Sequence, residues 1–353
     1  MRFIFAFLSF LILIQAMIFS INLFADEDGR VWRDIHEERW MAKEMHAGNN
    51  IAGRQSYRIR ALVTEMIKQA ETPPEILVLG SSRSMLVGEE LLGRSTVVNN
   101  SVSSSRLIHY FSVLGQYMGR GLKPSRVLIG VDPWIFKNEK LIIWPMEAGA
   151  INLASYLNIN IAQLGFDNDL NWTSYFSGDK AYNIIFKSTN NISCNELIAI
   201  HNENTPCAMR RSDGSLKYPD EMIARSKDDV TADVVRTARG RMHSYDGFNK
   251  LDPTRLDQLR QLLVYLVSEK IPVDIFLAPY HPLVETYQSG KRDWILTQEA
   301  ENSVRKIAKD LGIPVMGSYS ASIAGCDDSE FYDDIHARES CVGRILHPVY
   351  RQH

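Results

Sequence analysis

The stretch Glu75–Ser84, EILVLGSSRS, decides the fold that we expect, because an apolar run breaks abruptly into glycine, two serines and an arginine. Ile76–Leu79 is a continuous β-prone run, typical of a strand buried on both faces of a parallel sheet, and the prolines before it block a helix. Ligands of open α/β sheets bind beyond the carboxyl ends of the strands. The turn Gly80–Ser84 is therefore a candidate functional site.

The serines of this turn have two interpretations. Gly80 permits a tight turn, and a serine hydroxyl placed there lies near backbone N–H groups that could stabilise an oxyanion, which makes it a candidate nucleophile. Alternatively, Ser81 and Ser82 only cap a helix whose body is Met85–Leu92, and this stretch alone favours the cap. Other parts of the chain have to decide.

The composition is that of a globular protein. Its 353 residues are enough for one large domain or for a domain with a sizeable insertion. The formal net charge of -3 leaves no basic surplus for binding nucleic acid, and the cysteines show no zinc-type pairing. We expect neither a nucleic-acid partner nor a metal site.

Residues 1–25 predict a transmembrane signal anchor. An almost uninterrupted apolar run follows Arg2, and acidic residues come directly after it. This charge pattern favours a single-pass protein of the inner membrane with its main domain in the periplasm or another extracytoplasmic space. A signal peptide cleaved after Ala25 is the alternative, which Leu23 disfavours because small residues are preferred at the minus-three position.

Four cysteines agree with export. Cys194 and Cys207 are close in sequence, as are Cys326 and Cys341, so two local disulfides are the simplest of the three possible pairings. Four buried free thiols are the alternative.

Residues 26–72 are expected to form a juxtamembrane helical segment, and residues 73–353 an α/β domain. Strands and helices alternate along most of this domain, which predicts a flavodoxin-like three-layer α/β/α sandwich with a mainly parallel sheet of five strands. The rhythm is lost over residues 135–250, an insertion that forms either a lid or substrate-binding wall, or a structural decoration. The predicted strands are Glu75–Leu79, Thr96–Val98, Arg126–Val131, Val273–Ala278 and Ile313–Met316.

Aromatic residues of the insertion also have two interpretations. Trp144, Trp172, Tyr175 and Phe176 are candidates for stacking on sugar rings. A small hydrophobic core is the more common use of such residues.

A serine nucleophile needs a base that takes its proton and a carboxylate that orients the base. Asp333 and His336, in the segment FYDDIH, have a D-x-x-H spacing that allows one loop to present the imidazole with the carboxylate behind it. Taken alone, such a pair is more often a solvated loop. Combined with the serine turn, it predicts a catalytic triad with Ser82.

The motifs GSSR and FYDDIH together resemble those of the SGNH hydrolases, also called the GDSL-like family. The resemblance covers residues 74–132 and 250–341, with its two strong motifs first and last in the fold. It implies that Ser82 is the nucleophile and that His336, oriented by Asp333, is the base. Triad chemistry requires no metal or organic cofactor.

The middle motifs differ from the family pattern. Ser101 stands where the family has an oxyanion-binding glycine, although its backbone N–H could still donate. Asp132 stands where the family has an asparagine, and an ionised carboxylate there would repel an oxyanion. Asn99 and Asn100 are candidate substitutes as donors.

Two further residues are candidates for binding substrate. His281 follows a predicted strand, where it either holds substrate or serves as a structural histidine of a turn. Arg83 either attracts an anionic glycan or phosphate, or pairs with a carboxylate such as Glu89 or Asp132.

The departures resemble those of membrane-anchored or periplasmic SGNH-like proteins that modify bacterial surface polysaccharides, such as the alginate acetyltransferase group and the D-alanine transfer proteins of teichoic acids. This implies a serine esterase or O-acyltransferase that works through an acyl-serine intermediate. The expected substrate is an acyl ester of a cell-surface glycan, and the expected acyl group is acetyl. The expected partners are that glycan or another acylated substrate, and an integral membrane acyl-transfer protein. The alternative is a catalytically inactive SGNH-like scaffold that binds polysaccharide or membrane partner proteins. Asp132 and Ser101 motivate this alternative.

Overall fold

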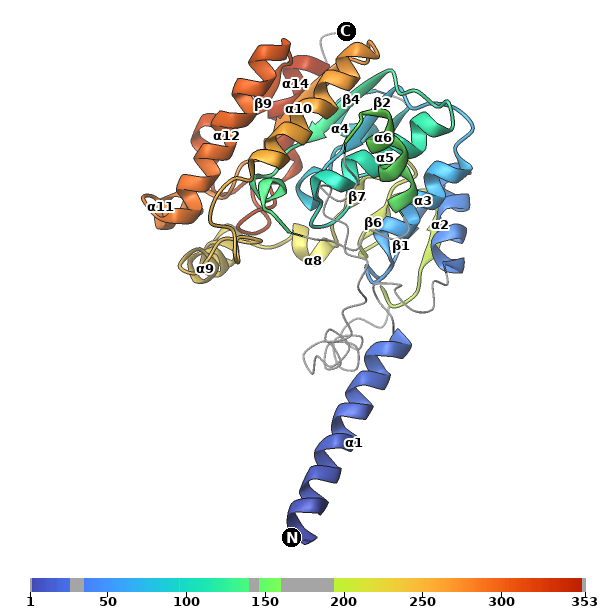
Figure 1. Ribbon diagram of the computed structural model, residues 1–353, viewed down its shortest axis with the longest axis vertical. Coiled ribbons are helices and arrows are strands. Elements are labelled where there is room, and N and C mark those ends of the chain that lie inside the picture. The colour runs from blue at the N-terminus through green and yellow to red at the C-terminus, as the bar shows by residue number, and fades with distance from the viewer. Residues whose placement is uncertain (1, 26–34, 95, 140–145, 160–193, 351–353) are drawn as a thin grey trace.

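A parallel sheet of five strands lies at the centre of the computed structural model (Figure 1), in the order β3-β2-β4-β8-β9. Numbered within this sheet, the order is 2-1-3-4-5, as in flavodoxin-like sheets. The prediction of a five-stranded parallel sheet is confirmed. The strands are β2 (Ile76–Leu79), β3 (Val97–Asn99), β4 (Arg126–Gly130), β8 (Val273–Leu277) and β9 (Val315–Gly317). The structure describes the chain except residues 1, 26–34, 95, 140–145, 160–193 and 351–353.

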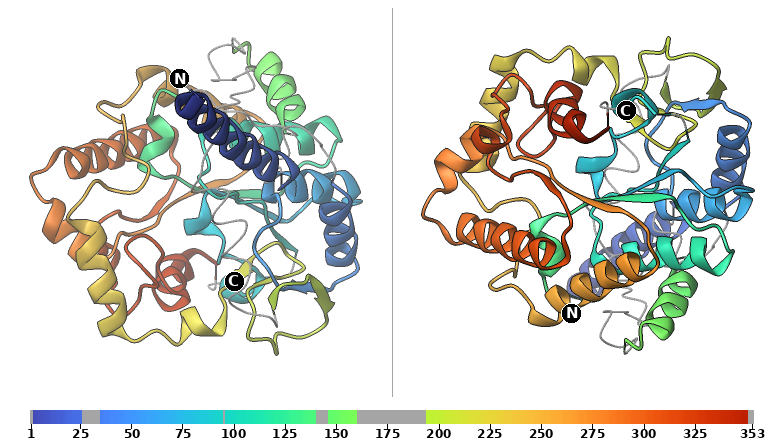
Figure 2. Two further views of the ribbon diagram at one scale, coloured as in Figure 1. Left: turned by 90° about the horizontal axis from the view of Figure 1, so that it is seen from below. Right: turned by 90° about the horizontal axis from the view of Figure 1, so that it is seen from above.

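Helices cover both faces of the sheet, as Figure 2 shows. The apolar run of β2 explains this arrangement, because successive side chains of a strand point to opposite faces. Leu77 and Leu79 join one core cluster, whereas Ile76 and Val78 join another. The first face is covered by α3 (Ile59–Gln69), α5 (Leu107–Gly119), α10 (Pro253–Ser268) and α12 (Arg292–Leu311). The second face is covered by α4 (Glu89–Leu92), α13 (Ala321–Ala324) and α14 (Glu339–Tyr350).

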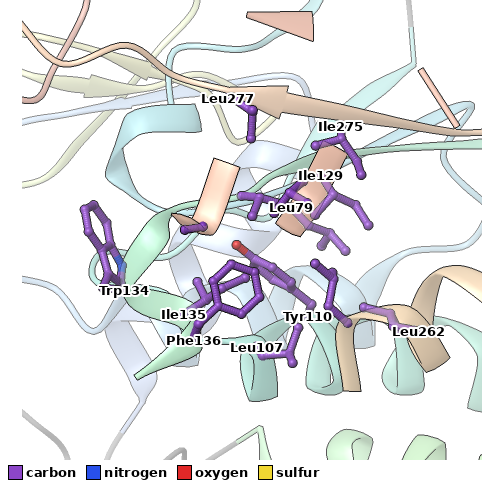
Figure 3. Close-up of a cluster of buried hydrophobic side chains, with 14 of the residues drawn as sticks. Leu79, Leu107, Tyr110, Ile129, Trp134, Ile135, Phe136, Leu262, Ile275 and Leu277 are labelled. Atoms are coloured by element: carbon purple, nitrogen blue, oxygen red, sulfur yellow. The ribbon is translucent and has the colours of Figure 1, made fainter. Parts of the chain in front are cut away.

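The larger core reaches the carboxyl end of the sheet, where the serine turn lies. Figure 3 shows Leu79, Ile129 and Leu277 of three neighbouring strands above Tyr110 of α5. The Tyr110 hydroxyl donates to the carbonyl of Gly130 at 2.6 Å. Trp134 extends the same core from the short helix η2 (Pro133–Phe136), which follows β4. Burial of these side chains gives the turn after β2 a rigid support.

A second, antiparallel sheet joins the segment before the domain to the insertion. Its order is β5-β1-β6-β7. Its first strand along the chain, β1 (Asn50–Ala52), lies within residues 26–72, for which only helices are predicted. The helix α2 (His36–His46) packs on α3, so the described part of residues 26–72 belongs to the folded body. The insertion contributes β5 (Ile198–Ile200), β6 (Met209–Arg210), β7 (Leu216–Lys217), α6 (Glu147–Tyr156), α8 (Asp220–Ile223) and α9 (Lys227–Ala238). Trp144, Trp172, Tyr175 and Phe176 lie outside the described residues.

Both predicted disulfides are present. Cys194, which precedes β5, is bonded to Cys207, which precedes β6, and Cys326 is bonded to Cys341. The latter bond closes the segment that carries FYDDIH. Two disulfides are consistent with an extracytoplasmic protein.

The first helix, α1 (Arg2–Ala25), has 24 residues and is drawn apart from the α/β domain in Figure 1. Within the residues that the structure describes, no helix is both long enough and apolar enough to cross a membrane, so the anchor predicted over residues 1–25 is not confirmed.

Candidate active site

The two serines of the turn after β2 have different roles. The hydroxyl of Ser81 caps the short helix η1 (Ser82–Ser84) by accepting a hydrogen bond from the Arg83 N–H at 3.1 Å. Ser81 is fully buried, whereas Ser82 is partly exposed. The cap and the candidate nucleophile are therefore neighbouring residues, not competing interpretations of one residue.

The helix predicted over Met85–Leu92 is shorter in the structure. Only Glu89–Leu92, which is α4, is helical, because Gly88 before it has an extended backbone with φ -141 and ψ -170. Gly80 is needed here for packing, since a Cβ atom added at this position would lie 2.4 Å from the Ser84 hydroxyl. Close packing of Gly80 on Ser84 holds Ser82 at the carboxyl end of β2.

Ser82, His336 and Asp333 form one chain of hydrogen bonds. The distance from Ser82 Oγ to His336 Nε2 is 2.8 Å, and the distance from His336 Nδ1 to Asp333 Oδ2 is 2.7 Å. Because the carboxylate can only accept at Nδ1, this ring nitrogen carries the proton and Nε2 accepts from the serine. The structure thus brings together three residues that the sequence predicts as a triad, in the tautomer that a general base needs.

The D-x-x-H spacing positions the carboxylate through the backbone of its own loop. The second carboxylate oxygen of Asp333, Oδ1, accepts the N–H groups of Ile335 at 2.9 Å and of His336 at 2.8 Å. Burial acts to raise the pKa of Asp333, but the hydrogen bonds from the imidazole and from these N–H groups outweigh it and lower the pKa below its ordinary value. Asp333 is therefore held as a carboxylate facing the imidazole. The side chains of His336 and Asp333 remain 17% and 31% exposed, so the site is open to a substrate.

Arg83 does not face the substrate space, unlike the prediction that it attracts an anionic ligand. Its side chain is 1% exposed and pairs with Asp132, 3% exposed, at 2.9 Å. This is the alternative that the sequence analysis left open. Burial acts against the charge of Arg83, but the surrounding tyrosines and Asp132 raise its pKa above the ordinary value, so the guanidinium stays charged.

Ser101, Asn99 and Asn100, which are predicted to bind the oxyanion, already form hydrogen bonds within the protein. The N–H of Ser101 donates to Asn99 Oδ1 at 2.9 Å, and Asn99 Nδ2 donates to the carbonyls of Ser84 and Val87. Asn100 Nδ2 donates to the Tyr117 hydroxyl at 3.0 Å. The Asn99 side chain thus holds the serine turn in place, and the Asn100 side chain is bonded to α5. The backbone N–H of Ser82 has no acceptor among the described residues, so it is the remaining candidate donor to an oxyanion.

Asp132 is a further departure from the predicted oxyanion site. One carboxylate oxygen accepts from Arg83, and the other, Oδ2, is buried without a hydrogen-bond partner among the described residues. Because a carboxylate only accepts hydrogen bonds, Asp132 is not a donor to an oxyanion at this position.

His281 is a structural residue and not a substrate ligand. It is fully buried, and its Nδ1 accepts the Leu283 N–H at 3.1 Å, which caps α11 (Pro282–Gln288). Its ring packs on Phe331, at 5.1 Å between ring centroids. The structure therefore favours the second of the two predicted roles.

Sequence reasoning missed three residues around the triad. The ring of Tyr218, from the insertion, lies edge-on to His336 with centroids 6.1 Å apart. His243, also from the insertion, is exposed, packs edge-on against Trp134 at 5.7 Å and is close enough to interact electrostatically with His336. Burial, and then the neighbouring triad carboxylate, raise the pKa of Asp334. No local sequence motif identifies Tyr218 or His243 as site residues, because they reach the triad only through the folding of the insertion.

Comparison with known proteins adds no identification, since no family model matches the chain and no curated protein sequence matches it. Within the described part of the chain, no group of three or more His, Cys, Asp and Glu side chains is arranged to hold a metal ion.

Proposed function

We propose that this protein is a serine esterase or O-acyltransferase with an acyl-serine intermediate. The observation that carries the proposal is the hydrogen-bonded chain Ser82–His336–Asp333, with a partly exposed serine at its end. Nucleophile, base and orienting carboxylate within hydrogen-bond reach are the signature of an activated serine. The same three residues support membership of the SGNH hydrolases.

The geometry defines the role of each group. His336 Nε2 takes the proton of Ser82 as Oγ attacks the acyl carbonyl carbon, and Asp333 stabilises the imidazolium. The Ser82 N–H donates to the oxyanion. When the intermediate collapses, the proton on Nε2 passes to the leaving alkoxide, and the acyl group stays on Ser82. Water or a sugar hydroxyl then gives its proton to His336 and attacks the acyl-serine, and His336 returns this proton to Ser82 Oγ as the acyl group leaves the serine. The acceptor alone decides between hydrolysis and transfer.

The substrate that we propose is an acyl ester, expected to be acetyl, of an extracytoplasmic glycan. Two disulfides support a location outside the cytoplasm. Our proposal keeps residues 1–25 as a single-pass anchor in the inner membrane, which would hold the domain beside an integral membrane acyl-transfer partner.

A cavity next to the triad loop has room for part of a ligand, and its lining mixes charged side chains with apolar ones. It has a volume of ≈ 350 Å³, within the range of about 300 to 1,000 Å³ that ligand sites have. Tyr332, which precedes the triad carboxylate in sequence, lies in its wall. Charged groups around it include Glu90, Glu203, Arg211, Lys217 and Glu339.

A second function is favoured by the oxyanion region. Asp132 accepts instead of donating, and the N–H of Ser101 is already bonded to Asn99. Loss of a single oxyanion donor costs about 100- to 1,000-fold in rate. A catalytically inactive scaffold that binds polysaccharide or membrane partners is therefore the alternative.

The test is labelling of the purified full chain with a fluorophosphonate probe. We expect the wild type to be labelled, and Ser82→Ala and His336→Ala to lose labelling. Ser103→Ala, at an exposed serine of a neighbouring loop, is the matched control and should be labelled like the wild type. A folded wild type that is not labelled would favour the scaffold, and glycan-binding assays would then follow.

A further inference from the structure

We propose that Arg83 is a positioning residue that fixes the distance between Ser82 and His336 by joining the serine turn to the triad loop, with Asp132 as its counter-ion. This inference rests on the proposed function, because the distance that it concerns is that of the triad.

The contacts of one guanidinium carry the argument. Arg83 follows the candidate nucleophile directly, and its Nε donates to the carbonyl of Ile335 at 3.0 Å, one residue before the candidate base. Its Nη2 donates to the carbonyl of Ala278, just beyond β8, and its Nη1 to Asp132, just beyond β4. A single side chain thus joins the ends of three strands to the loop that carries His336.

Aromatic rings hold the guanidinium in its plane. Its central carbon lies 4.1 Å from the ring centroid of Tyr280 and 5.7 Å from that of Trp134. Stacking restricts rotation of the planar group, so the directions of its N–H donors are fixed. A lysine would bring one charge on a flexible stem and could not make the same three contacts in fixed directions.

The counter-ion explains the aspartate that stands in place of the family's asparagine. A buried arginine requires a carboxylate, and Asp132 is the one that its Nη1 meets. Asparagine at this position would leave the charge of Arg83 unpaired. An arginine at position 83 therefore requires an aspartate at position 132.

The test separates positioning from the need to balance charge. Arg83→Met combined with Asp132→Leu removes both buried charges together, so neither is left unpaired, and Arg83→Lys keeps the charge but not the fixed donors. Arg126→Met combined with Asp274→Leu is the control, because this pair, 2.7 Å apart, also joins two strands, β4 and β8, but lies away from the serine.

We expect the first double variant to be labelled by fluorophosphonate about 100-fold more slowly than the wild type, the usual cost of a misplacement near 1 Å. Arg83→Lys should be slowed at least about tenfold. The control double variant should be labelled at the wild-type rate. Labelling of either Arg83 variant within about threefold of the wild type would overturn the inference.

A second readout does not depend on activity. The ¹⁵N chemical shift of His336 Nε2 in the full chain reports its hydrogen bond to Ser82, and Ser82→Ala gives the reference value. We expect the Arg83 variants to move toward this reference and the control double variant to stay at the wild-type value. If the wild type is not labelled, the proposed function fails, and the chemical shift then tests the positioning role alone. Unchanged shifts in the Arg83 variants would overturn that role.

Discussion

Replacing Asp333 by asparagine tests the proposed chemistry most directly, because the structure predicts which way the amide will point. Oδ1 of Asp333 accepts two backbone N–H groups, from Ile335 and His336. The amide oxygen will keep these bonds, since the amide nitrogen cannot accept them. The NH₂ group must then face His336 Nδ1, which forces the imidazole proton onto Nε2, where it blocks acceptance of the serine proton.

The magnitude follows from the loss of the correct tautomer. We expect the rate of fluorophosphonate labelling to fall about 10³- to 10⁴-fold, which is about 4 to 5.5 kcal/mol in activation free energy. Thermal unfolding should change little, because the backbone hydrogen bonds of the loop are kept. Asp328→Asn is the control: this carboxylate lies in the same loop but pairs with Lys227 at 2.8 Å, so labelling should not change.

The assay is the second-order labelling rate of both variants and of the wild type, measured at the same pH and with folding checked by circular dichroism. Labelling of the Asp333→Asn variant within about tenfold of the wild-type rate would refute the tautomer argument. A similar loss in the Asp328→Asn variant would show that the loop as a whole, and not the carboxylate, is responsible.

Three further predictions address the loop, a neighbouring carboxylate and the cavity. Replacing both Cys326 and Cys341 by serine removes a disulfide with a sequence separation of 15. It should lower the free energy of unfolding, measured in denaturant titrations, by about 3 kcal/mol, and it should slow labelling. Unchanged labelling would mean that the disulfide does not support the triad loop. The folded-state pKa of Asp334 is raised by burial and by Asp333, so its ionised form destabilises the fold above that pKa. Asp334→Asn should therefore raise the melting temperature at pH 7. This gain should disappear as the pH falls through the folded-state pKa toward the unfolded-state value of about 3.9. An equal gain at pH 7 and below the unfolded-state pKa would contradict this. Glu90→Trp places a large ring at the rim of the cavity beside Tyr332, and should raise the KM for an acetylated oligosaccharide while leaving hydrolysis of 4-nitrophenyl acetate unchanged. Equal effects on both substrates would exclude the cavity as a glycan site.

Local chemistry made much of the site predictable. The apolar run Ile76–Leu79 predicts a strand that is buried on both faces, so this strand and the turn after it follow from a few neighbouring residues. The D-x-x-H spacing brings its own carboxylate to its own imidazole within one loop, and both disulfides close short segments. Each of these features depends on residues that are close in the chain.

Features that depend on distant residues required the tertiary structure. Arg83 and Ile335 are 252 positions apart, and Arg83 and Asp132 are 49 apart, so sequence left open whether the arginine meets a substrate or a carboxylate. The N–H of Ser101 looked available because its acceptor, the Asn99 side chain, could have pointed toward a ligand. The strand β1 was missed because its three residues are stabilised by pairing with the insertion, and not by their own propensity.

The sequence by itself predicted the strands of the central sheet, the simplest cysteine pairing and the three residues of the candidate triad, because each of them lies in a local pattern. Only the tertiary structure decided that Ser81 caps and Ser82 faces the imidazole, that Arg83 is enclosed with Asp132, and that the predicted oxyanion donors support the turn. The physical reason is that a buried polar side chain takes whichever partner the packed fold brings to it, and packing joins segments whose separation in the chain carries no information about their contact.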